Sequence, residues 1–206
     1  PDPLPPGTPY LSTTDPLEAG RLDIVKRSLA QGESGAPVDL RVHAPRAPGT
    51  YALVVFQHGF LSDVDWYDEI LGHLASHGFV VVAPQMYAPD GIPLGKPTAA
   101  DEAVRAADVV AWSRRSAGAV AGVATDPAPP GLAGHSRGGK VVWLEVLTGG
   151  LEARAIAGVD PVDGRGGPLG GQLPAMDGPV SGTPPSQILG YELGPVSTGS
   201  FGACAP

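Results

Sequence analysis

The sequence predicts a single α/β domain with a mostly parallel central sheet flanked by helices. Residues 51–59 (YALVVFQHG) and 79–85 (FVVVAPQ) are nearly continuous apolar runs rich in Val, the pattern of strands that are covered on both faces. Segments of helical period lie between and after these runs, so strands and helices alternate along the chain. A length of 206 residues suits one domain.

Residues 1–20 are expected to form an irregular, Pro-rich N-terminal arm, ahead of a folded domain over residues 21–206. The arm contains six Pro and shows little periodicity, which is typical of a segment that lies over a surface without regular structure. Next in the chain, residues 22–29 (LDIVKRSL) and 38–45 (VDLRVHAP) alternate apolar and polar side chains. This alternation predicts two half-buried antiparallel strands at the edge of the sheet.

Two crossover helices are predicted. Residues 63–78 follow the first Val-rich strand and carry acidic side chains near their start, where these favour the helix dipole. Residues 98–115 begin with Thr98, three residues before an acidic pair, which indicates a capped helix start. The faces expected to be buried are Trp66, Ile70, Leu71 and Leu74 in the first helix and Val104, Ala107, Val110 and Ala111 in the second.

Composition excludes several classes of protein. The net charge of −8, with no basic stripe, makes nucleic acid a poor partner. No apolar run approaches the roughly 18 to 20 residues of a transmembrane helix. The single Cys204 excludes an internal disulfide framework and a Cys-based zinc site. Although 30 Gly and 24 Pro approach the composition of disordered chains, the apolar residues are clustered in runs, which favours a folded core.

The strongest chemical signal is Gly134-His135-Ser136-Arg137-Gly138, a G-x-S-x-G pattern between a short apolar strand and a helical segment. In such an elbow the Ser occupies a strained turn, and Gly134 and Gly138 let the strand and helix backbones pass without Cβ clashes. The pattern alone also fits an ordinary turn in a Gly-rich chain. Its position between strand and helix favours a nucleophilic Ser136.

A second element supports the first. Residues 57–61 (QHGFL) directly follow a predicted strand, where this arrangement places a loop that donates an N–H to an oxyanion. We expect the backbone amides of Phe60 and Arg137 to be the two donors. His58 fits either a general base or a residue that orders this loop, and its place beside the loop favours the second interpretation.

Five segments together resemble the chlorophyllase family of the α/β-hydrolase superfamily, whose members remove phytol from chlorophyll. They are GHSRGGK (134–140), GVDPVDG (158–164), HGFLSDVDWY (58–67), LASHGFVVVAPQMY (74–87) and CAP (204–206). The resemblance covers roughly residues 37–206 and implies an α/β-hydrolase fold, here without its last strand and helix. It also implies a triad of Ser, Asp and His in that chain order, with Ser136 as nucleophile and Asp160 as the acid.

Read from the residues alone, the acid position stays open between Asp160, Asp163 and Asp177. Asp160 is favoured because it ends a predicted strand, although an Asp-Pro pair also closes strands by simple turn chemistry. All five His residues precede Ser136, whereas the resemblance places the catalytic His after the acid. We therefore expect the base to lie outside this sequence and the 206 residues alone to be a poor enzyme.

Three smaller features have structural interpretations. The acidic group Asp63, Asp65, Asp68 and Glu69 is interpreted as charge capping at a helix start, so no metal is assigned. Trp112 and Trp143 are predicted to pack in the core or in a pocket wall and not to stack on a ligand. The strand before the elbow is expected to be short because Pro127, Pro129 and Pro130 precede it.

These observations favour a serine carboxylic-ester hydrolase that acts on a small-molecule or lipid-like ester through an acyl-enzyme on Ser136, without a cofactor. The resemblance implies chlorophyll as the substrate. A broad lipase or short-chain esterase is the first alternative, because the motifs define the reaction and leave the ester open. The second alternative is a noncatalytic binding module on a hydrolase scaffold.

Overall fold

The computed structural model describes residue 15 and residues 17–87, 97–163 and 182–190. Most of the predicted arm, together with Asp177, Cys204 and the CAP segment, lies outside these ranges. The described residues form an eight-stranded sheet in the order β1-β2-β4-β3-β6-β7-β8, with β5 paired to β3 beside this path. The strands are β1 (Ile24–Leu29), β2 (Leu40–Pro45), β3 (Thr50–Gln57), β4 (Phe79–Pro84), β5 (Ala124–Thr125), β6 (Gly131–His135), β7 (Ala155–Val159) and β8 (Ser186–Leu189).

The sheet is mostly parallel, as predicted. β1 pairs with β2, and β2 with β4, in antiparallel register. The pairs β4–β3, β3–β6, β6–β7 and β7–β8 are all parallel. The alternating segments 22–29 and 38–45 therefore form the antiparallel edge, and the Val-rich runs lie in the interior of the sheet.

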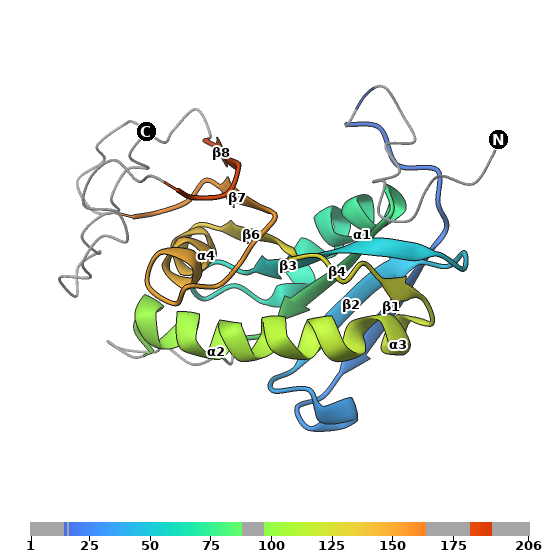
Figure 1. Cartoon of the computed structure of the whole chain (residues 1–206), viewed down its shortest axis with the longest axis horizontal. Coiled ribbons are helices and arrows are strands. Elements are labelled where there is room, and N and C mark those ends of the chain that lie inside the picture. The colour runs from blue at the N-terminus through green and yellow to red at the C-terminus, as the bar shows by residue number, and fades with distance from the viewer. Residues whose placement is uncertain (1–14, 16, 88–96, 164–181, 191–206) are drawn as a thin grey trace.

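Helices cover the two faces of the sheet unequally (Figure 1). They are the 3-10 turns η1 (Glu33–Gly35) and η2 (Val64–Tyr67), the π-helical turn η3 (Ser113–Ala117), and the α-helices α1 (Asp68–Ser76), α2 (Ala99–Trp112), α3 (Gly118–Ala121) and α4 (Arg137–Leu147). α1 packs on one face through Leu71 and Ala75 against Phe56 and Val81. α2, α3 and α4 pack on the other face, where Trp112 and Trp143 are buried as predicted.

The second crossover helix begins as predicted. Thr98 accepts a hydrogen bond from the Asp101 amide at 3.1 Å, and the Asp101 carboxylate accepts one from the Thr98 amide at 2.9 Å, which completes a capping box. The buried face was predicted partly wrongly, because Val104 is 72% exposed. Val110 is buried as predicted, and the rest of the buried stripe includes Ala103 and Ala106, whose small side chains let α2 approach α4 closely.

The first crossover helix also differs from the prediction at its start. The α-helix begins at Asp68, and Trp66 lies in the preceding 3-10 turn η2 with 72% of its surface exposed. A 3-10 turn has about three residues per turn, so the predicted α-helical spacing from Trp66 to Ile70 is broken there. Leu71 alone of the expected apolar face is fully buried.

Glu145 of α4 is a buried carboxyl group with a perturbed pKa. It is 1% exposed, and neither carboxyl oxygen has a hydrogen-bond partner among the residues the structure describes. Burial raises the pKa of Glu145 to about 8. An unfolded chain ionises near the ordinary Glu value, so the folded state holds this proton more tightly.

The pKa of Glu145 makes folding stability pH-dependent. The free energy of unfolding should fall as the pH rises from the ordinary Glu value toward about 8, by up to about 1.4 kcal/mol per pH unit. Glu145→Gln removes this titration. The unfolding temperature of the variant minus that of the parent should therefore be larger at pH 8.5 than at pH 5. Thermal unfolding followed by circular dichroism tests this, with the exposed Glu152→Gln as control. An equal difference at both pH values would contradict the prediction.

Candidate active site

Three of the predicted site segments meet at the carboxyl ends of the parallel strands. β3, β6 and β7 are adjacent parallel strands, with Gln57 paired to Gly134 and His135 paired to Val159. Their carboxyl ends therefore emerge side by side, which is where ligands bind in open α/β sheets. The loop after β3, the elbow after β6 and the DPV segment after β7 share this edge.

Ser136 occupies the strained turn that the G-x-S-x-G pattern predicts. It lies between β6 and α4 with φ 51° and ψ −117°, a backbone conformation that L-residues rarely adopt. The Gly134 backbone packs on Gly138, so a Cβ on Gly134 would lie 2.7 Å from the Gly139 nitrogen. A Cβ on Gly138 would meet the Gln57 carbonyl and lie 2.6 Å from the His58 carbonyl oxygen. Both glycines are thus required by the close approach of backbones.

Ser136 and Asp160 lie at adjoining strand ends. The Ser136 amide donates to the Val159 carbonyl at 3.0 Å, and the Val162 amide donates to the Ser136 carbonyl at 3.2 Å. These two bonds bracket Asp160, whose own φ is 45°. Asp163 lies farther along the chain and pairs with Lys140 of α4, with 3.5 Å between the ammonium and carboxylate. The arrangement favours Asp160 over Asp163 as the acid beside the nucleophile.

The loop after β3 is held on both sides of Phe60. The Gly59 amide donates to the Tyr67 hydroxyl at 2.9 Å, and the Leu61 amide donates to the Tyr87 hydroxyl at 3.0 Å. Between them, the Phe60 amide has no hydrogen-bond acceptor among the described residues. Arg137 is the first residue of α4, so its amide has no carbonyl partner within the helix. Both amides that were predicted to be oxyanion donors are therefore left available for a ligand by the described part of the chain.

His58 supports this loop through both ring nitrogens. Nε2 accepts a hydrogen bond from the Met86 amide at 3.0 Å, and Nδ1 lies 2.7 Å from the Gly59 carbonyl oxygen, to which it donates. Burial lowers the pKa of His58, which favours this neutral ring. With both nitrogens engaged, His58 fits the role of ordering the loop and does not fit that of a base.

The Arg137 side chain joins the elbow to α2 and to the loop after β3. Its guanidinium lies 2.6 Å from the buried Glu102 carboxylate, donates to the Pro97 carbonyl, and sits over the Phe60 ring at 5.2 Å from the centroid. Burial raises the pKa of Glu102, while the charge of Arg137 acts in the opposite direction. Sequence reasoning placed Glu102 only in a capping pair, because nothing local indicates its distant partner.

The acidic group at the start of α1 forms ion pairs and caps. Asp63 accepts from the Asp65 amide at 2.9 Å, Asp65 pairs with Arg41, and Asp68 pairs with Lys26. Across the described ranges, no three His, Cys, Asp or Glu side chains are grouped as metal ligands. Asp63 caps η2, and Asp68 and Glu69 lie in the first turn of α1, which fits the interpretation as charge capping.

No imidazole reaches Ser136 in the described part of the chain. The Ser136 hydroxyl makes no hydrogen bond to a described His. The nearest His in sequence, His135, has its Nδ1 2.7 Å from the Tyr67 hydroxyl. Near α1, His43 lies 3.4 Å from the Asp68 carboxylate and His77 Nε2 lies 2.9 Å from the Glu18 carbonyl.

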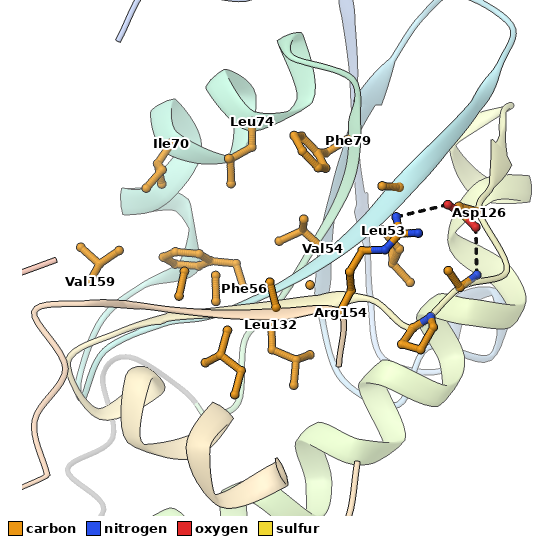
Figure 2. Close-up of a pocket in the computed structure, with 18 of the residues that line it drawn as sticks. Leu53, Val54, Phe56, Ile70, Leu74, Phe79, Asp126, Leu132, Arg154 and Val159 are labelled. Carbon is orange, nitrogen blue, oxygen red and sulfur yellow. Dashed lines mark hydrogen bonds and ion pairs between the residues drawn. The ribbon is translucent and has the colours of Figure 1, made fainter. Parts of the chain in front are cut away.

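An apolar cavity of about 320 Å³ lies on the α1 side of the sheet (Figure 2). Ile70 and Leu74 form one wall, and side chains of β3, β6 and β7 form the floor. Its polar end is the ion pair of Arg154 with Asp126, 3.4 Å apart. Because these two residues precede β7 and β6, the pair lies at the amino ends of the strands, opposite Ser136. The cavity's charged groups therefore do not belong to the candidate active site.

The chlorophyllase family model matches residues 12–206. The chain belongs to the chlorophyllase family. Its central sheet with helices on both faces agrees with the α/β-hydrolase fold of that family. No helix among the described residues is long and apolar enough to span a membrane.

Curated relatives agree with this assignment. Chlorophyllase-1, chloroplastic, of Citrus sinensis is 32% identical over 209 aligned positions, which cover 97% of this chain and 61% of the relative. Chlorophyllase-2 of Arabidopsis thaliana is 33% identical over 137 residues, 63% of this chain and 42% of the relative. Chlorophyllase type 0 of Chenopodium album is 31% identical over 164 residues, 74% of this chain and 47% of the relative. The chain thus spans about half the length of the chlorophyllases it matches.

The residues that sequence reasoning missed are Tyr67, Tyr87 and Glu102. Each acts on a partner far along the chain, as when Tyr87 reaches Leu61 across 26 positions. Tyr67 and Tyr87 do close two of the segments that resemble chlorophyllases. That position was the available signal, although it does not indicate what either hydroxyl contacts.

Proposed function

We propose that the protein is a serine carboxylic-ester hydrolase that forms an acyl-enzyme on Ser136. The observation that carries this proposal is the placement of backbone strain. Of the four non-Gly residues with positive φ in the described ranges, Leu61, Ser136 and Asp160 lie in the three loops at the carboxyl ends of β3, β6 and β7. Such conformations cost on the order of 1–3 kcal/mol each and are concentrated at functional sites.

The proposed reaction follows from these positions. The Ser136 hydroxyl attacks the ester carbonyl carbon, and a general base takes its proton. The carbonyl oxygen becomes an oxyanion that the Phe60 and Arg137 amides stabilise. The tetrahedral intermediate collapses with loss of the alcohol, and water then hydrolyses the acyl-enzyme.

Asp160 is proposed to orient the base and to stabilise its protonated form. We place the base outside the described residues, because the imidazoles of the described His residues have other partners. This is the one role in the mechanism that no described side chain fills.

For the substrate, the relatives' names favour the ester of chlorophyll. The exposed Phe60 ring, with the Tyr87 ring at 6.3 Å, provides an aromatic rim beside the proposed oxyanion donors, which suits a large apolar ester. A lipase or short-chain esterase is the alternative within this class. Comparing kcat/KM on chlorophyll with kcat/KM on p-nitrophenyl butyrate separates the two.

Labelling with a fluorophosphonate probe tests the reaction class. The protein at its natural length should react, and peptide mass spectrometry should place the adduct on Ser136, because only an activated Ser attacks the probe. The control is the same protein after heat denaturation. Labelling no greater than in that control would reject the proposal and favour a noncatalytic binding module, an alternative motivated by the finding that no described imidazole contacts Ser136.

A further inference from the structure

The hydroxyl of Tyr67 lies where the loop after β3 meets the elbow. It accepts a hydrogen bond from the Gly59 amide at 2.9 Å and lies 2.7 Å from His135 Nδ1 and 3.2 Å from the Ser62 hydroxyl. Gly59 is adjacent to the proposed oxyanion donor Phe60, and His135 is adjacent to the proposed nucleophile. One oxygen atom therefore connects the neighbours of both groups.

The protons in this cluster can be assigned. Gly59 uses one lone pair of the Tyr67 oxygen, which leaves a single phenolic proton for either His135 or Ser62. The shorter separation favours His135, so Nδ1 is the acceptor and the ring proton resides on Nε2. Burial lowers the pKa of His135, while the charge of Asp160 raises it, and a neutral ring keeps Nδ1 able to accept.

The surroundings leave this cluster little freedom to move. The Tyr67 ring packs on Phe56 of β3 at a centroid distance of 5.1 Å and on His135 at 5.7 Å. A Cβ on Gly59 would lie 2.8 Å from His135 Nδ1 and 3.1 Å from the Tyr67 oxygen. The loop therefore approaches the elbow as closely as a glycine allows.

On the basis of the proposed function, we infer that Tyr67 is a positioning residue that holds the Phe60 amide in register with Ser136 through Gly59 and His135. Tyr87 supports the other side of the loop, since its hydroxyl accepts from Leu61 and donates to the Gly59 carbonyl at 3.1 Å. Leu61 needs such support because its φ is 57°. An oxyanion donor is effective only when its position is defined before the reaction begins.

Tyr67→Phe tests this role, with Tyr51→Phe as the matched control. Tyr51 is also half-buried and donates one hydrogen bond, to the Ala47 carbonyl at 2.9 Å, in the region where β3 begins. With p-nitrophenyl butyrate and the protein at its natural length, Tyr67→Phe should lower kcat by about 10- to 100-fold. KM should stay within about twofold, because the lost stabilisation belongs to the transition state. The control should change neither constant.

A second pair of variants separates positioning from packing. His135→Asn keeps a polar acceptor near the position of Nδ1 and should retain more of kcat than His135→Leu, which has none. The inference would be overturned if Tyr67→Phe left kcat unchanged. It would also be overturned if kcat fell only in proportion to a smaller fraction of folded protein.

The ring proton of His135 provides a readout that does not depend on activity. A long-range proton–nitrogen NMR spectrum should show the Nε2–H form in the parent and a mixture of both forms in Tyr67→Phe. An Nδ1–H form in the parent would reject the inference even if Ser136 is reactive. If the spectrum agrees but the probe fails to label Ser136, the proposed function has failed and the contact between Tyr67 and His135 stands as structure only.

Discussion

Ser136→Ala is expected to lower kcat on an ester by at least about a thousandfold. Alanine retains the Cβ that the strained turn already accommodates, and it removes only the hydroxyl that would attack the carbonyl carbon. That hydroxyl has no hydrogen bond to any described residue, so its removal leaves no described polar partner unsatisfied. Stability should therefore change by less than about 1 kcal/mol.

The contrast between lost activity and retained stability is the signature to measure. Initial rates on p-nitrophenyl butyrate and urea unfolding curves of the same preparations provide both values. Ser28→Ala, an exposed position on the edge strand β1, is the control and should change neither. Turnover within tenfold of the parent would exclude Ser136 as the nucleophile.

Gly138→Ala is expected to prevent folding or to lower the free energy of unfolding by at least about 3 kcal/mol. The added Cβ would meet the Gln57 carbonyl and lie 2.6 Å from the His58 carbonyl oxygen. These are backbone atoms of β3 and of the loop that follows it, so no side-chain rotation relieves the clash. α4 would have to move away from the sheet, which would also displace the elbow.

Gly131→Ala is the matched control for this variant. Gly131 lies on β6, and its added Cβ would lie 3.5 Å from a Val54 methyl group, an ordinary van der Waals contact. Urea unfolding should show Gly131→Ala close to the parent and Gly138→Ala strongly shifted or already unfolded in water. Equal stability of the two variants would mean that β3 and α4 are not packed as closely as described.

The parts of this protein that could be predicted from sequence depend on short-range physics. The Gly positions of the elbow, the cap at Thr98 and the end of the Pro run before β6 each involve residues within a few positions of one another. Steric exclusion by a Cβ, the missing N–H of Pro and the reach of a capping side chain operate over that distance. The Val-rich runs are similar, because burial on both faces leaves no place for polar residues.

The faces of the crossover helices were less predictable. Val104 is more apolar than the Ala residues around it, and hydrophobicity alone therefore placed it inside. α2 packs against α4 through Ala103 and Ala106, and this packing leaves Val104 on the exposed side of the helix. Trp66 was misplaced because a 3-10 turn shifted the helical phase before α1 began.

The contacts that could not be predicted from the sequence are those between residues far apart in the chain. The proposed type of reaction and the roles proposed for Ser136 and the amides around it follow from motifs a few residues long, whose geometry the local backbone imposes. The contact of Tyr67 with His135 joins residues 68 positions apart, and the ion pair of Arg137 joins two helices. Nothing in either local sequence specifies such a partner, because the sheet order that brings β3 beside β6 determines which side chains meet.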